Sequence, residues 1–159
     1  MGFTASGISA TTVTTDQQAP LGFVLTVPDG DNGIQEWTYV KAGAELLQGT
    51  VAMRKGATAT REVVVATTAT AIVPNVAIVG VAQHTIASGS YGFILSTGIG
   101  EVLADDGGND QLNDPLVVGG TTGRADVMAA GEEHCVFAFS TENATGVGTL
   151  MTCWINCAG

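Results

Sequence analysis

The chain has 159 residues and a mass of 16.1 kDa, which fits one domain, or one domain with a short arm. Phosphate groups are neutralised by many clustered Lys and Arg residues, and this chain has five in all and a net charge of −10, so we expect it to bind neither nucleic acid nor a membrane surface. Only 13% of the residues are charged, which indicates a surface of small neutral residues or one covered by other subunits.

The chain is expected to divide into an arm and a domain. Residues 1–20 are small and polar and have no hydrophobic periodicity, so they predict a flexible arm that either stays disordered or orders against a partner. The domain is expected over residues 21–159. The longest apolar stretch, Ala71–Ala82, is interrupted by Pro74 and too short to span a bilayer, and no secretory signal is evident at the start. Synthesis in a reducing cytoplasm is therefore expected.

From residue 21 onward the sequence predicts an all-β fold. Short runs rich in Val, Ile, Thr and aromatic residues are separated by Gly, Pro, Asn and Asp turns about every 8–14 residues, which is typical of a sandwich or barrel. One helical turn is predicted over Ala42–Leu47, and no window carries a longer apolar stripe with helical spacing. No repeat at a fixed period is evident, which argues against a solenoid or propeller. The expected strands are Gly22–Val27, Gln35–Val40, Thr50–Met53, Glu62–Thr67, Asn75–Ala82, Tyr91–Thr97, Gly100–Leu103, Pro115–Val118, Arg124–Met128, His134–Phe139 and Gly148–Ile155. We predict a single compact β-sandwich or barrel, of the jelly-roll or β-tulip type, with little helix.

The adjacent pair His134 and Cys135 is the nearest approach to a catalytic Cys–His arrangement. On a strand the two side chains would point to opposite faces, so they cannot form a hydrogen-bonded dyad locally. The same alternation places Cys135, Phe137 and Phe139 on one face, which we interpret as core. Cys135 is accordingly expected to be a small buried residue.

Cys153 and Cys157 leave three interpretations open. Packed or free thiols are the simplest one, and a disulfide between the two is an alternative in an oxidised particle. A zinc site would need two further ligands from His84, His134 or Cys135, and nothing else in the sequence supports it.

Two acidic loops and one glycine-rich loop contain residue types that occur in ligand sites. Asp29-x-Asp31-x-Gly33 does not match the EF-hand pattern, and turn propensity accounts for it. Asp105–Asp110 has oxygen donors and glycines, so a bound cation is a weaker alternative to a simple turn. Gly119–Arg124 lacks the Lys and the helix of a phosphate-binding loop and predicts a hairpin connection.

No enzymatic site is predicted. Fifteen acidic residues are present, but no pair is singled out for acid–base chemistry, and no hydrolase or protease motif occurs. We therefore expect no catalytic residue, no cofactor site and no metal site. An exposed aromatic platform for sugars would have to come from Trp37, Tyr39, Tyr91 or Trp154, all four of which we expect in the core or an interface.

The order of segments resembles that of small capsid decoration, or cement, proteins of tailed phages. Similar proteins have a strand, a Gly/Asp turn and an aromatic strand ending in a YVKAG-like phrase, then a VGVA strand leading to a YGFVL-like strand, and a DPL…GR hairpin. The stretches that carry the resemblance here are Leu21–Gly43, Gly49–Ala52, Ile78–Ala82, Ser88–Leu95, Gly98–Val102, Asn113–Val118 and Thr122–Arg124. The tail Cys153–Gly159 has no counterpart in that pattern.

The resemblance implies a virion structural protein that is made in the host cytoplasm, binds the outer surface of the capsid lattice and stabilises the phage head. The implied partners are the major capsid protein and further copies of the chain, as a homodimer or homotrimer. Two alternatives stay open: a carbohydrate- or receptor-binding β-module of a head fibre or tail, and a minor tail or connector subunit.

Overall fold

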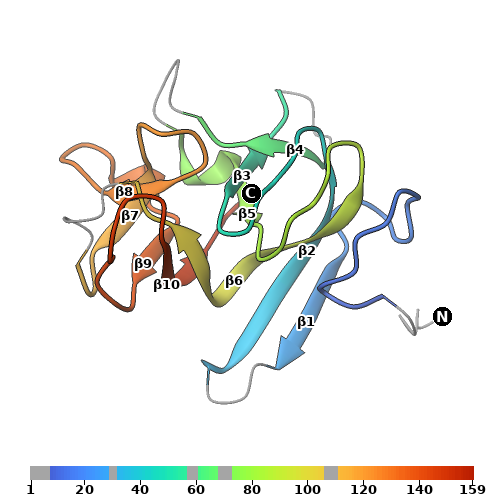
Figure 1. Cartoon of the computed structure of the whole chain (residues 1–159), viewed down its shortest axis with the longest axis horizontal. Coiled ribbons are helices and arrows are strands. Elements are labelled where there is room, and N and C mark those ends of the chain that lie inside the picture. The colour runs from blue at the N-terminus through green and yellow to red at the C-terminus, as the bar shows by residue number, and fades with distance from the viewer. Residues whose placement is uncertain (1–7, 29–31, 57–60, 68–72, 106–110) are drawn as a thin grey trace.

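A computed structural model describes residues 8–28, 32–56, 61–67, 73–105 and 111–159 (Figure 1). Within these ranges the chain is all-β, with ten strands and two short 3-10 turns, and it contains no helix long and apolar enough to cross a membrane. The all-β prediction is confirmed. The strands are β1 (Val24–Pro28), β2 (Ile34–Ala42), β3 (Val51–Arg54), β4 (Glu62–Val65), β5 (Ile78–Val81), β6 (Tyr91–Leu103), β7 (Pro115–Val118), β8 (Ala125–Val127), β9 (Ala138–Ser140) and β10 (Leu150–Asn156), and the turns are η2 (Asn75–Ala77) and η3 (Glu133–Cys135).

Five strands close into a barrel. They follow the order β2-β4-β3-β5-β6, and the ring closes because β2 also pairs with β6. Each strand contributes at least one small or medium apolar residue to a single buried cluster, whose members are Val40, Ala42, Leu46, Ala52, Val63, Val79, Ala82, Ile86 and Ile94. Since every barrel strand contributes a residue to this cluster, the cluster forms the core inside the barrel. Its small side chains suit the narrow lumen of a five-stranded ring.

The remaining strands extend the sheet from one side of the barrel, in the order β6-β10-β9-β7-β8 (Figure 1). β6 belongs to both parts, since its first half pairs with β2 and its second half pairs with β10. Two separate strands, Tyr91–Thr97 and Gly100–Leu103, were predicted here. They are one strand because Gly98, with φ of +121°, bends the backbone without ending the pairing.

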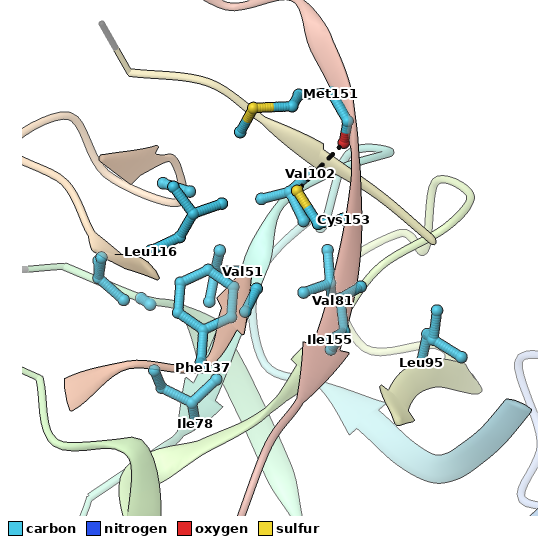
Figure 2. Packing of buried hydrophobic residues seen from close by; sticks show 14 of the residues in the cluster. Val51, Ile78, Val81, Leu95, Val102, Leu116, Phe137, Met151, Cys153 and Ile155 are labelled. Carbon is cyan, nitrogen blue, oxygen red and sulfur yellow. Dashed lines mark hydrogen bonds between the residues drawn. The ribbon is translucent and has the colours of Figure 1, made fainter. Parts of the chain in front are cut away.

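The larger buried cluster lies between the barrel and the extension. Figure 2 shows Phe137, Leu116, Cys153 and Ile155 from the extension facing Val51 and Ile78 from the barrel side. Phe137 is 1% exposed, and full burial of such a side chain stabilises a fold by about 1.5–3 kcal/mol. This cluster therefore holds the extension rigidly against the barrel.

Two loops of the barrel, residues 43–50 and 83–90, have the same succession of local conformations. The loop after β2 and the loop after β5 pair with each other through reciprocal hydrogen bonds between Leu46 and Ile86, of 2.9 and 2.8 Å. Each loop then turns at a glycine with positive φ, at Gly49 and Gly89. The predicted helical turn over Ala42–Leu47 is wrong, because this cross-loop pairing overrides local helix propensity.

Two further predictions need correction. Asn75–Ala77 forms a 3-10 turn before β5, so the strand begins later than expected. Glu133–Cys135 forms another 3-10 turn, and β9 covers only Ala138–Ser140. The predicted shared face of Cys135, Phe137 and Phe139 is therefore wrong at its last member. Phe139 points outward, while its neighbours in β9 are buried.

The described part of the expected arm, residues 8–20, lies against the chain's own barrel. Thr14 and Tyr91 exchange backbone hydrogen bonds of 3.0 and 2.8 Å, and the backbone N–H of Gln18 donates to the Tyr39 hydroxyl at 3.0 Å. Ile8 and Ala19 pack on the larger core cluster. This segment thus covers one side of β2 and β6.

Candidate interaction surface

None of the three cysteines, all in the described part of the chain, is in a disulfide. Cys153 and Cys157 are four residues apart along extended chain, about 13 Å, which is too far for a disulfide. Burial raises the pKa of Cys157 to about 12 and also raises the pKa of Cys135, where Glu132 and Glu133 add to the effect. High pKa values keep thiols protonated and unreactive. Among the described residues no three His, Cys, Asp or Glu side chains gather as metal ligands.

His84, considered as a zinc ligand, lies in the turn between β5 and β6. Both of its ring nitrogens are shielded from solvent and have no hydrogen-bond partner among the described residues. Burial lowers its pKa below 6.5. A neutral imidazole in an apolar setting is what this environment favours. His134 is exposed and lies in η3, next to Cys135 as predicted.

The acidic and glycine-rich loops have structural explanations where they are described. Asp29 and Asp31 lie outside the described residues, as does most of the second acidic loop. In that loop the carboxylate of Asp105 accepts a hydrogen bond of 2.8 Å from the backbone N–H of Thr121. Residues 119–124 connect the antiparallel strands β7 and β8, so the predicted hairpin is confirmed.

Three of the four candidate aromatic residues belong to the interior. Trp37 and Tyr39 are buried, and Tyr91 is half-buried and stacks on Tyr39 with a ring separation of 6.3 Å. Trp154 differs, because 42% of it is exposed on the outer side of β10. Trp37, Tyr39 and Tyr91 therefore occupy the predicted core positions. Trp154 does not, and its exposed ring is available to a partner.

Trp154 is the centre of an apolar row that crosses four neighbouring strands. In the strand register Trp154 is opposite Ile99 of β6 on one side and Phe139 of β9 on the other, and Phe139 is opposite Pro115 of β7. Phe139 is 47% exposed, while Ile99 and Pro115 are half-buried. We call these four residues the outer apolar row. Directly opposed side chains on one sheet face lie about 4.5–5.5 Å apart at Cβ, so the row is continuous.

The surroundings of the outer apolar row are polar. On the same face of β10, Thr152 and Asn156 flank Trp154, and on β6 Thr97 and Glu101 are opposite those two residues. The backbone N–H of Thr152 donates to the Glu142 carboxylate at 2.7 Å, and this bond lowers the pKa of Glu142. A central aromatic anchor with a polar rim is the usual anatomy of a protein recognition surface.

The chain has the architecture of a known phage structural domain. The solved structure of the head fibre gp8.5 N base in bacteriophage phi29 superposes with a TM-score of 0.52 and 17% sequence identity, covering 76% of this chain and 92% of that one. The fold is similar to that of a phage head-fibre base. At 17% identity, this structural likeness shows that the two chains share a fold. No protein-family model matches the chain, and no curated protein matches its sequence.

Sequence reasoning placed Trp154 among the candidates but missed Phe139. The error came from extending one strand through residues 134–139, which put Phe139 on the buried face. A usable sequence cue was present, because Phe139 is followed by Ser140 and preceded by Ala138, and small residues on both sides of an aromatic residue fit a strand whose large side chain faces out.

Proposed function

We propose that the chain is a non-catalytic structural protein of a tailed-phage virion, which binds the outer surface of the capsid as a decoration protein. The fold likeness to a phage head-fibre base is the observation that carries the proposal. The decoration-type sequence resemblance supports it. A protein that binds the assembled lattice but not its separated subunits stabilises the lattice by mass action.

The outer apolar row is the proposed contact with the major capsid protein. Trp is the residue type most enriched at binding hot spots, and here it lies on a rigid sheet between two ordered neighbours. At 42% and 47% exposure, Trp154 and Phe139 together offer roughly 150–200 Å² of apolar surface. A standard interface needs about 800 Å² on each partner, so the row is an anchor within a larger contact. Assembly of the chain as a homodimer or homotrimer would multiply the anchors on one lattice site.

The test measures binding to phage heads that lack this chain. Wild-type protein, the double variant W154A/F139A and the matched control V13A/V24A are sedimented with the heads. The control removes two exposed apolar side chains away from the row, one beside Thr14, which pairs with Tyr91 at the start of β6, and one on β1. We expect the control to bind like the wild type and W154A/F139A to bind at least about 30-fold more weakly, which corresponds to a hot-spot loss of about 2 kcal/mol.

Absence of wild-type binding to the heads, or virion density for the chain only at the tail, would contradict the decoration role and favour a tail or connector subunit. Equal binding by all three proteins would remove the row as the contact. Since the substituted residues are exposed, thermal denaturation is expected to be nearly unchanged and serves as the folding control.

A second candidate function is glycan binding, as in a fibre or receptor-binding module. The side-by-side exposure of Trp154 and Phe139 favours it, because paired aromatic side chains with a polar rim suit the apolar face of a sugar ring. Micromolar binding on a glycan array that is lost in W154A, with no binding to heads, would favour this candidate over decoration.

A further inference from the structure

Charge is distributed unevenly along this acidic chain. Four of its five basic residues fall within positions 41–62, beside two acidic residues. Positions 105–142 hold eight acidic residues and a single basic one, Arg124. One region is thus net positive in a chain whose total charge is −10.

The fold brings the four basic residues to one end of the barrel. Lys41 of β2 is in register with Glu62 of β4, and the backbone N–H of Lys41 donates to the carbonyl of Arg61 at 3.1 Å. Arg54, at the end of β3, is in register with Val63 next to Glu62. Two of the basic residues lie on β2 and β3, and the other two directly follow β3 and precede β4. We call Lys41, Arg54, Lys55 and Arg61 the basic pole.

Among the described residues, only one of the four cations of the basic pole has an ion-pair partner. Lys55 and Glu62 form an ion pair of 2.7 Å, the only ion pair among the described residues. The side chain of Lys55 is 54% exposed, so even this cation faces solvent. Nε of Arg54 is shielded from solvent and has no hydrogen-bond partner in the described part of the chain. A carboxylate of a partner would meet positive charge that, among the described residues, only the Glu62 carboxylate pairs with.

The acidic region lies in the other half of the molecule. Figure 1 shows β7, β8 and β9 at the opposite side of the view from β2 and β4. Described acidic residues there include Asp126 on β8, Glu133 on η3 and Glu142 after β9. Hydrogen bonds from the backbone of Glu133 itself and from the backbone of Gly131 lower the pKa of the Glu133 carboxyl, so it stays ionised well below neutral pH. The chain is therefore electrically polar, with the basic pole at one end of the barrel and the acidic region on the extension.

We propose that the basic pole is the docking surface for the acidic region of a second copy of the same chain. Apposing the poles of two copies would bring like charges together, which costs free energy, so a two-fold pole-to-pole contact is disfavoured. Pole-to-acidic contact pairs opposite charges, either reciprocally across a two-fold axis or head to tail in a ring or filament. Nucleic acid is a poor alternative occupant, because the total charge of −10 repels phosphates. The proposal is independent of capsid binding.

The experiment compares two substitutions that change the net charge equally. Lys55→Glu reverses a charge in the basic pole, and Arg124→Glu makes the same change in the acidic region. Self-association of the full chain at about 0.1 mM is measured by sedimentation velocity at about 0.05 M and 0.5 M salt. We expect the wild type to associate at low salt and dissociate at high salt. K55E should associate at least about tenfold more weakly, whereas R124E should associate as strongly as the wild type or more strongly.

A charge swap tests whether the basic pole pairs with the acidic region. The variant D126K/E133K makes the acidic region more positive, and we expect it to associate poorly alone but to associate with K55E when the two are mixed. Three results would overturn the proposal: a wild type that stays monomeric at low salt, equal association of K55E and R124E, or a mixture that associates no better than its two components. Circular dichroism of each variant confirms that the β fold is retained.

Discussion

Asn75 gives the sharpest stability prediction, because one side chain joins three separate parts of the chain. Its Nδ2 group donates to the carbonyl of Val136 at 2.8 Å and to that of Asn156 at 3.2 Å, and its Oδ1 accepts the backbone N–H of Ala158 at 3.0 Å. The turn before β5, the segment before β9 and the end of β10 are thereby tied together.

We expect Asn75→Ala to lower the free energy of unfolding by about 2 kcal/mol. Three hydrogen bonds contribute about 0.5–1.5 kcal/mol each, and partial exposure of the site lets water replace some of them. For a chain of this size the melting temperature should fall by about 4–8 °C. Urea unfolding gives the free energy, and thermal unfolding followed by circular dichroism gives the shift.

Asn143→Ala is the matched control for Asn75→Ala. Asn143 is exposed and its side chain accepts one bond, of 2.8 Å, from the backbone N–H of Leu112, so its loss should cost less than about 1 kcal/mol. A cost for Asn75→Ala no larger than that of the control would refute the idea that this side chain links the two halves of the fold.

Two further predictions concern pH and the turns of the barrel. Because burial lowers the pKa of His84 in the folded state, the unfolded state binds the proton more readily. The free energy of unfolding should therefore fall as the pH drops through about 6.5. Urea unfolding between about pH 7.5 and 5.5 should show this loss in the wild type and in H134N but not in H84N. A Cβ at Gly49, where φ is +78°, would lie 2.5 Å from Cδ2 of Leu150, whereas Gly89 has a similar φ of +82° and nothing within 4 Å. Gly49→Ala should therefore cost about 3 kcal/mol or more and Gly89→Ala about 1 kcal/mol, and equal costs would show that the clash at Gly49 is relieved at little expense.

The approximate positions of most strands were predictable from the sequence because they depend on local chemistry. β-branched and aromatic runs between turn residues mark most strands, and Pro115 at the first position of β7 fits a residue that cannot donate within a ladder. The hairpin between β7 and β8 followed from its glycines alone. These features need no knowledge of distant contacts.

Features that depend on distant pairing were not predictable. The segment at residues 42–47 contains good helix formers, yet Leu46 pairs with Ile86 across the barrel. Gly98 resembles a strand break in sequence but bends a continuous strand, because the edge of β2 lies against it: a Cβ there would be 3.0 Å from the carbonyl of Ile34. The outward position of Phe139 depends on the turn at Glu133–Cys135, which shifts the alternation.

The low charge content has a cause in the fold itself. All four residues of β5 are buried, and so is the stretch from Gly92 to Ser96 in β6. These strands are covered by the barrel interior on one face and by the larger core cluster on the other, so they need no alternating polar residues. A hydrophobic composition therefore does not by itself require covering subunits. Large apolar side chains that stay exposed include Ile34, Val76 and Val147. Trp154 and Phe139 are the two aromatic ones, and they lie opposite each other on neighbouring strands, where alternation would otherwise place polar side chains.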